Sequence, residues 1–89
     1  MPPSRTVSVD AVRFGAIIRR LRLRRGWTIT KLAQRAGMNA TYLGLIENGR
    51  NVPSLIAILE LTEVLNADAG DVMREVAAAR NPPPPAEEE

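Results

Sequence analysis

The feature that most constrains the fold is a helix-ending residue followed within a few positions by a helix-starting residue. Glycine and asparagine tolerate the left-handed conformation that ends a helix, whereas Ser, Thr, Asn and Asp accept hydrogen bonds from the free amides where a helix begins. This pattern divides the chain into five short helices, which we expect to form a compact all-α domain. The pairs are Gly26 with Thr28, Gly37 with Asn39, Asn48-Gly49 with Ser54, and Asn66 with Asp68.

Apolar spacing identifies the face that each helix buries. Asp10 is the expected N-cap of the first helix, and the second extends from Thr28 to about Ala36. The third covers about 40–48, the fourth about 53–65 and the fifth about 68–79. Ala33 must be small, because the second and third helices cross there. The residues expected to face inward are Phe14, Ile18, Leu21, Leu32, Ala33, Leu43, Ile46, Leu55, Ile58, Leu61 and Leu65.

The two ends differ from the middle in composition. Residues 1–9 hold prolines and small polar residues and are expected to form a flexible arm, so that the folded domain covers 10–80. The segment 81–89, NPPPPAEEE, has too few apolar residues to build a core. We expect a disordered Pro/Glu tail, with a docking segment as the alternative.

Composition argues against an enzyme. The chain of 89 residues has no cysteine and no histidine. Thiolate metal sites, disulfides and cysteine nucleophiles are therefore excluded, as are histidine bases and histidine metal ligands. We expect no metal and no cofactor. Because no apolar run approaches the roughly 18 residues that span a bilayer, we expect no membrane association and a cytoplasmic, nucleoid-associated location.

Charge is divided unevenly along the chain. Residues 1–50 hold ten Arg and Lys side chains against two acids, a formal +8, and residues 51–89 hold two arginines against eight acids, a formal −6, which together give the net +2. A basic half beside an acidic half indicates one surface suited to a polyanion. Solvated arginines that serve solubility are the alternative.

The second and third helices are short and are joined by Gly37-Met38-Asn39. This is the helix-turn-helix arrangement, in which the second helix of the pair lies in the major groove of DNA. Gly37 supplies the positive φ angle of the turn. Leu43 and Ile46 are expected to hold the third helix on the core, with its opposite face outward.

The stretch Phe14–Met73 resembles the phage repressor/Cro-type helix-turn-helix regulators of the xenobiotic-response-element family. The resemblance rests on IRRLRLRRG, KLAQRAGMNATYLGLIENGR and PSL in register. The run YLGLIENGRNVPSL is also similar to restriction–modification controller proteins. The resemblance implies a lambda-repressor-like domain of five helices that binds double-stranded DNA and regulates transcription.

The resemblance also implies roles for individual residues. Ala40, Thr41 and Leu45 fall where the family reads base edges. Arg22 and Glu47 fall where it has an ion pair between the first and third helices. Thr28 and Ser54 begin helices whose N-termini can meet a phosphate. The remaining DNA-binding candidates are Lys31, Asn39, Tyr42, Asn48 and Arg50.

Two departures from the family pattern affect base reading. Ile29 stands where the family commonly has a glutamine that contacts DNA. Ala40, Gly44 and Leu45 have no hydrogen-bonding side chain, and adenine or guanine edges are normally read by Asn, Gln, Arg or Lys. Sequence preference then rests on thymine methyl groups, DNA shape and arginines, or this face binds a protein instead. Trp27 is expected in the core, and Tyr42 either packs there or reaches a phosphate.

The predicted fourth helix is apolar on more than one face. Ile56 and Leu59 lie outside its inward stripe, and an exposed apolar patch commonly marks an interface. We expect a homodimer that binds a palindromic operator, unless the C-terminal segment covers the patch. An antitoxin or another protein-interaction module with the same fold is the rival function. The expected interface residues are Ile56, Leu59, Glu63, Met73 and Val76.

Overall fold

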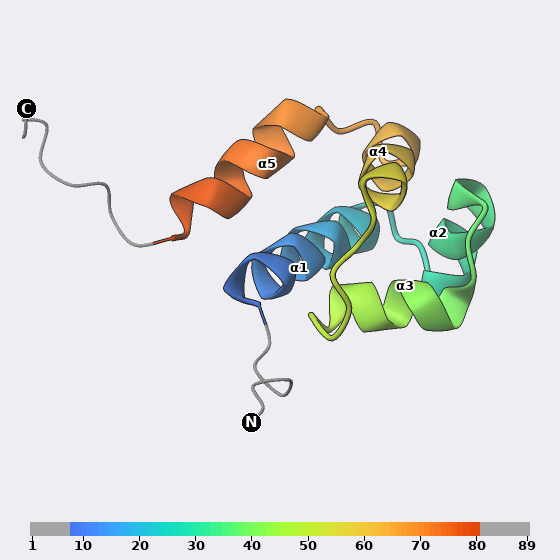
Figure 1. Ribbon diagram of the computed structural model, residues 1–89. Coiled ribbons are helices and arrows are strands. Elements are labelled where there is room, and N and C mark those ends of the chain that lie inside the picture. The colour runs from blue at the N-terminus through green and yellow to red at the C-terminus, as the bar shows by residue number, and fades with distance from the viewer. Residues whose placement is uncertain (1–7, 81–89) are drawn as a thin grey trace, which may run out of the picture.

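The computed structural model describes residues 8–80. In this part of the chain the all-α architecture is confirmed: α1 (Val9–Arg24), α2 (Ile29–Ala36), α3 (Ala40–Glu47), α4 (Leu55–Val64) and α5 (Ala69–Ala78) follow one another without a strand. α1 contacts α3 and α5, and α2 contacts α3 and α4 (Figure 1). Residues 1–7 and 81–89, which hold most of the predicted arm and all of the predicted tail, lie outside the described residues.

The helix boundaries follow the predicted cap pattern. The side chains of Thr28, Asn39, Ser54 and Asp68 each accept a hydrogen bond from a backbone amide in the first turn of the helix that follows. The backbone takes positive φ angles at Gly26, Gly37, Gly49 and Asn66. The chain can therefore reverse direction sharply between helices, and this keeps α2 and α3 short.

The start of α1 differs from the prediction. Ser8, and not Asp10, is the N-cap, and its Oγ accepts a hydrogen bond from the amide of Ala11 at 3.2 Å. Asp10 lies inside the first turn and forms an ion pair with Arg80, in which Oδ2 lies 2.5 Å from Nη2. Both residue types cap helices well, and in the structure Ser8 is the cap while Asp10 pairs with Arg80.

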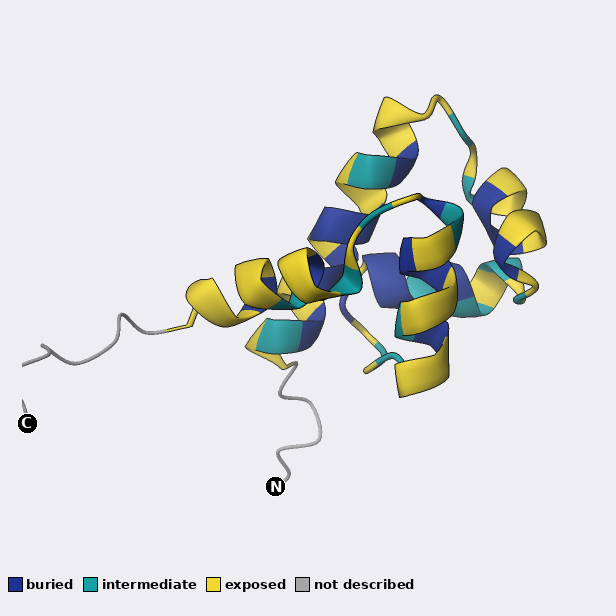
Figure 2. Ribbon diagram, turned by 90° about the horizontal axis from the view of Figure 1, so that it is seen from above, coloured by how far each residue is buried: buried dark blue, intermediate teal, exposed yellow. Residues whose placement is uncertain are grey.

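The core lies where α1, α2, α3 and α4 meet. The largest fully buried side chains are Ile18 of α1, Leu32 of α2, Leu43 and Ile46 of α3, and Leu61 of α4. Figure 2 shows the buried residues as bands on the inner sides of these helices. Each helix therefore buries one stripe of side chains and exposes its opposite face, as the periodicity predicts.

The inward stripe of α4 is shifted from the predicted one. The spacing predicts that Leu55 faces the core, but 70% of its surface is exposed. Ala57, Leu61 and Leu65 are buried instead, four residues apart, and Ile58 is half-buried. Leu55 lies in the same first turn as the buried Ala57 but about 200° away around the helix axis, so its side chain leaves from a different side of α4.

Candidate nucleic-acid interface

The turn between α2 and α3 is defined by backbone geometry and one side chain. Gly37 adopts φ 68°, and the amide of Met38 donates to the carbonyl of Ala33 at 2.9 Å. Asn39 then begins α3: its Oδ1 accepts hydrogen bonds from the amides of Thr41 at 2.7 Å and Tyr42 at 3.2 Å. These contacts end one helix and start the next within three residues, which sets the angle of α3 relative to α2.

α3 lies very close to the backbone of α1. A Cβ atom added at Gly15 would lie 2.1 Å from the carbonyl oxygen of Ile46 and 2.7 Å from that of Glu47. Gly15 therefore lets the two helix backbones touch at the end of α3. The sequence predicted a small residue at Ala33 for the crossing of α2 and α3, and Ala33 is buried, but the approach of α1 to α3 at Gly15 was missed. The available signal was a glycine inside the α1 pattern, where glycine usually costs stability.

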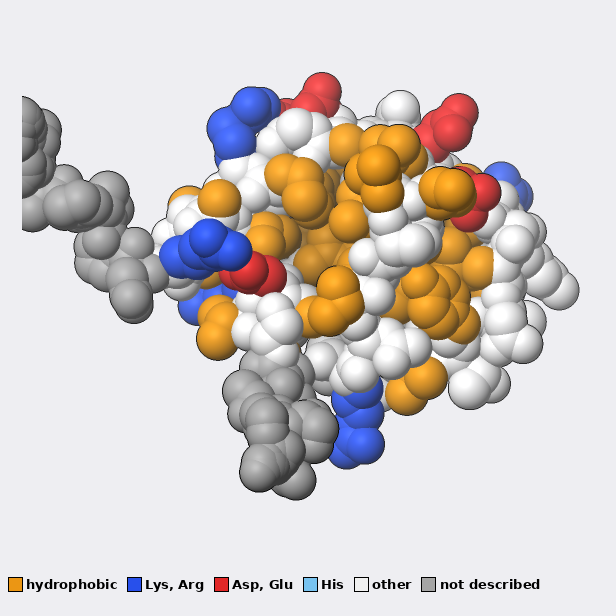
Figure 3. All heavy atoms as spheres, viewed as in Figure 1, with side chains coloured by type: hydrophobic (Ala, Val, Ile, Leu, Met, Phe, Trp, Pro, Cys, Tyr) orange, Lys and Arg blue, Asp and Glu red, His pale blue; other side chains and the backbone are white. Residues whose placement is uncertain are grey.

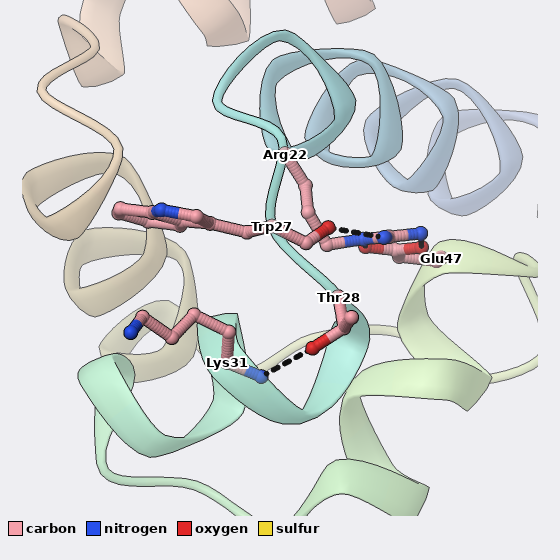
Figure 4. A network of polar contacts seen from close by, with 5 residues as sticks. All are labelled: Arg22, Trp27, Thr28, Lys31 and Glu47. Atoms are coloured by element: carbon pink, nitrogen blue, oxygen red, sulfur yellow. Dashed lines mark hydrogen bonds and ion pairs between the residues drawn. The ribbon is translucent and has the colours of Figure 1, made fainter.

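Arg22 and Glu47 form a buried ion pair between α1 and the end of α3 (Figure 4). Arg22 donates from Nε to Oε2 at 2.8 Å and from Nη2 to Oε1 at 2.9 Å, and its Nη1 donates to the carbonyl of Trp27 at 2.8 Å. The hydrogen bonds to Glu47 raise the pKa of Arg22 above its usual value. One guanidinium thus ties α1, the segment before α2 and α3 together.

The outward side of α3 carries the residues expected to read bases. Thr41 is exposed, and Ala40 and Leu45 are partly exposed, as is Gly44. Thr41 is the hydrogen-bonding side chain in this set, so the small or apolar character noted in the sequence does lie on the accessible surface. Ile29 packs against the core cluster instead of reaching outward. It therefore braces the helix pair through apolar contact.

The residues proposed to contact phosphates lie around α3. Thr28, Lys31, Asn39, Asn48, Arg50 and Ser54 are all exposed. Tyr42 is half-buried, and its hydroxyl oxygen accepts a hydrogen bond from the amide of Ser54 at 3.3 Å. This bond joins α3 to the start of α4. Candidate phosphate contacts therefore come from the starts of α2 and α3, and from the start of α4, which Tyr42 joins to α3.

The charge of this region is positive on its outer surface. Between residues 28 and 54 the acidic side chain is Glu47, which is buried and paired with Arg22. Lys31, Arg35 and Arg50 are exposed. With its single carboxylate neutralised inside, the helix pair presents cations and hydrogen-bond donors outward, a combination that suits a polyanion.

Trp27 is placed differently from a simple core residue. It is half-buried, and guanidinium carbons of Arg25 and Arg35 lie 5.2 Å and 5.0 Å from the centre of its ring. Arg25 also donates from Nη2 to the carbonyl of Leu65 at 3.0 Å. Arg25 therefore connects the segment before α2 to the end of α4, and Arg35 contacts the same ring from the last turn of α2. Sequence reasoning did not anticipate this arrangement.

The predicted dimer residues fall into three groups. Ile56 is 67% exposed and Leu59 is 50% exposed, and Glu63 is also exposed. Met73 is half-buried, whereas Val76 is 8% exposed and belongs to the core. Both line a shallow hollow, together with Val52, Pro53 and Ile58. Figure 3 shows apolar side chains spread over this face of the molecule.

Two kinds of feature are absent from residues 8–80. This part of the chain contains no cluster of three or more acidic side chains arranged to hold a metal ion. It also contains no helix that is long and apolar enough to cross a membrane.

Comparison with known proteins identifies the family. The model of the helix-turn-helix domain matches residues 13–76. The ImmF control region 10 kDa protein of Bacillus phage phi105 is 35% identical over 60 residues, which cover 67% of each chain.

Solved structures agree with this assignment. The restriction-modification controller protein C.AhdI from Aeromonas hydrophila is 33% identical, with a TM-score of 0.68 over 78% of this chain and 98% of that one. The clp gene regulator ClgR from C. glutamicum is 28% identical, with a TM-score of 0.72 over 81% of this chain and 94% of that one. The chain therefore belongs to the helix-turn-helix domain family and is a DNA-binding transcriptional regulator of that class.

Proposed function

We propose that the protein binds a palindromic operator as a homodimer, with α3 of each protomer in the major groove. The observation that carries this proposal is the chemistry around α3. Thr28, Asn39 and Ser54 use their oxygens to accept backbone amides of their own helices. Each of these side chains also has an O–H or N–H donor that the cap hydrogen bond does not use. Phosphate oxygens are acceptors, so the caps are chemically ready for a DNA backbone.

Tyr42 extends the same logic. Its phenolic oxygen accepts the Ser54 amide, which leaves the O–H free to donate to a phosphate. Lys31 and Arg50 add full positive charges, and Asn48 adds an amide. We assign these residues to positioning the protein on the duplex. Positioning contacts supply affinity that falls steeply with salt and do not themselves discriminate sequence.

We assign base reading to Ala40, Thr41 and Leu45. Their side chains can contact thymine methyl groups, and the Thr41 hydroxyl can also reach a base edge. With one hydrogen-bonding reader per protomer, discrimination at each position is modest. Sequence preference then relies on pairing two half-sites and on the deformability of the DNA between them.

We place the dimer contact on the face formed by α4 and its neighbours. Val52, Leu55, Ile56 and Leu59 are exposed by 50% or more. Such a set of apolar side chains on a small domain needs a partner surface. A two-fold axis there would place two α3 helices about 34 Å apart, the spacing of one turn of DNA.

Fluorescence anisotropy with labelled duplexes tests the DNA assignments. The chain should bind its own upstream region more tightly than an unrelated duplex at moderate salt. Lys31→Gln and Arg50→Gln should weaken both complexes equally, and each should reduce the salt slope by about 1. Thr41→Ala should reduce the difference in affinity between the upstream duplex and the unrelated duplex. Arg74→Gln, on α5, is the matched control and should leave the affinity for both duplexes unchanged. Equal affinity of the unmodified protein for both duplexes would refute sequence-specific binding.

Sedimentation velocity tests the dimer contact separately. Ile56→Glu should convert the dimer to a monomer and weaken binding to a two-half-site duplex far more than binding to one half-site. Leu23→Glu introduces the same charge at another exposed apolar residue, on α1, and should leave the dimer intact. A monomer in the unmodified protein, together with a co-purifying protein and no DNA binding, would favour the rival protein-interaction function.

A further inference from the structure

A second surface lies outside the DNA and dimer faces. Two shallow hollows run along the outer side of α1 and share Ala16 and Arg20. One begins against Ala78 and Ala79 at the end of α5, and the other continues to Leu23 and Arg24. Together they form one shallow groove, here called the α1 groove. Its exposed residues on α1 are Arg13, Ala16, Arg19, Arg20, Leu23 and Arg24.

The α1 groove is basic and largely without compensating charge. Arg20 pairs with Glu75, with 3.1 Å between Nη1 and Oε2. Arg13, Arg19 and Arg24 have no ion pair with any residue between 8 and 80. Leu23, which is 54% exposed, lies among them. An apolar floor bordered by unpaired arginines suits a ligand that is itself partly apolar and partly acidic.

The described chain ends at the start of this groove. α5 runs back along α1, so that Arg80 reaches Asp10 in the first turn of α1 (Figure 1). Ala79, the residue before Arg80, already lines the groove. Any continuation of the chain from Arg80 therefore leaves beside the end of the groove that is lined by alanines.

The residues that follow match the groove in order, charge and reach. Asn81-Pro82 is a dipeptide typical of turn initiation, and such a reversal would be needed to lead the chain back along α1. Pro82–Pro85 would then meet the alanine-lined part, and Glu87–Glu89 the arginine-lined part. Seven residues in the polyproline conformation extend about 22 Å. The fourteen-residue step from Asp10 to Arg24 along α1 is about 21 Å.

We propose that segment 81–89 docks in the α1 groove of its own chain, with its glutamates beside Arg19 and Arg24. The acidic end of the tail would then lie beside two arginines, Arg19 and Arg24, that form no ion pair with any residue between 8 and 80. A covalent tether gives the tail a high effective concentration at the groove, so that individually weak, exposed ion pairs are enough to hold it. A phosphate backbone would use the arginines but would gain nothing from the apolar floor.

Paramagnetic relaxation enhancement tests the docked tail. The chain has no cysteine, so Ala86→Cys provides a single site for a nitroxide and keeps all three tail glutamates. A docked tail should broaden the amides of Arg19–Arg24 at least as strongly as those of Asp10–Arg13, which lie next to the tether. An undocked tail should broaden the amides near the tether most, with a decline along α1. The second pattern would overturn the proposal.

Variants separate the electrostatic contact from its alternatives. Arg19→Gln with Arg24→Gln should restore the declining pattern, as should 1 M salt, at which the Debye length is about 3 Å. Arg74→Gln, an arginine on α5 outside the groove, should leave the broadening at Arg19–Arg24 unchanged. Broadening that persists in the double variant would overturn the assigned contact.

Two further outcomes assign the groove to other occupants. Broadening that appears only when labelled and isotope-enriched chains are mixed would show docking on a second copy. A declining pattern combined with weaker duplex binding by the double variant would assign the groove to DNA. Either result would contradict docking within one chain.

Discussion

α1 is joined to α3 and to α5 by the same chemistry, an arginine that donates two hydrogen bonds to a carboxylate, in two different environments. The Arg22 and Glu47 side chains are 9% and 2% exposed, whereas those of Arg20 and Glu75 are 45% and 49% exposed. A charge that is buried depends on its partner, whereas an exposed charge can exchange its partner for water. The first pair therefore fixes geometry, and the second pair adds little to stability.

The difference matches the tasks of the two interfaces. α3 must present its outward face at a defined angle, and it is held by Gly15, by Leu43 and Ile46 in the core, and by the buried pair. α5 buries Val72 and Val76 and completes its contact with α1 through exposed ion pairs. We infer that the α3 side of the molecule, which is proposed to read DNA, is rigid and that the α5 side tolerates change.

The largest expected effect comes from breaking the buried pair. Glu47→Gln should cost about 3 kcal/mol of unfolding free energy, because it leaves a buried guanidinium without a counter-charge. Glu75→Gln removes the same charge from the exposed pair and should shift the urea midpoint only slightly. Urea unfolding of the two variants, followed by circular dichroism, measures both. Equal losses would show that burial does not distinguish the two pairs.

The second effect concerns two helical glycines. Gly15→Ala should destabilise the protein by about 2 kcal/mol, because the new Cβ overlaps the backbone of Ile46 and neither helix can yield locally. A Cβ atom added at Gly44, on α3, would meet no other atom within 4 Å. Gly44→Ala should therefore stabilise the protein by about 0.5–1 kcal/mol through helix propensity. In thermal unfolding, the Tm should fall for Gly15→Ala and rise for Gly44→Ala. A Gly15→Ala variant with unchanged stability would show that the fold does not require the close approach of the α1 and α3 backbones.

Much of the fold follows from local signals. The caps Thr28, Asn39, Ser54 and Asp68 act on amides two or three residues away, so the residue type and its position are enough to predict them. The buried positions of α2 and α3 follow from periodicity for the same reason. The family resemblance added the pairing of Arg22 with Glu47, which are 25 residues apart.

The features that were missed depend on distant partners. Asp10 is not the cap of α1 and instead forms an ion pair with Arg80, which is 70 residues away. The role of Gly15 depends on where α3 crosses α1, and the role of Trp27 depends on two arginines, one of them on α2. Spacing alone predicts that Leu55 faces the core, whereas Leu55 is exposed in the structure. The edge of the core depends on how the helices pack, which spacing within one helix does not reveal.

The smallest expected effect is the acid and salt sensitivity of the α1–α5 contact. Hydrogen bonding to Arg80 lowers the pKa of Asp10, and hydrogen bonding to Arg20 lowers the pKa of Glu75. A carboxyl whose pKa is lower in the folded state contributes stability above its unfolded pKa, about 4, and loses that contribution as the pH falls through the folded pKa.

The double variant Asp10→Asn with Glu75→Gln isolates this contribution. At pH 7 and low salt its urea midpoint should lie slightly below that of the unmodified protein, because two attractive pairs are lost. The difference should disappear as the pH falls well below about 4, where the unmodified carboxyls are protonated as well, and it should shrink at about 1 M salt, where exposed pairs are screened. The buried Arg22–Glu47 pair is screened much less, so the midpoint deficit of Glu47→Gln at pH 7 should persist at high salt. A double-variant difference that persists at low pH and high salt would mean that Asp10 and Glu75 act through packing, and the contrast between the two interfaces would then rest on Gly15 and the core alone.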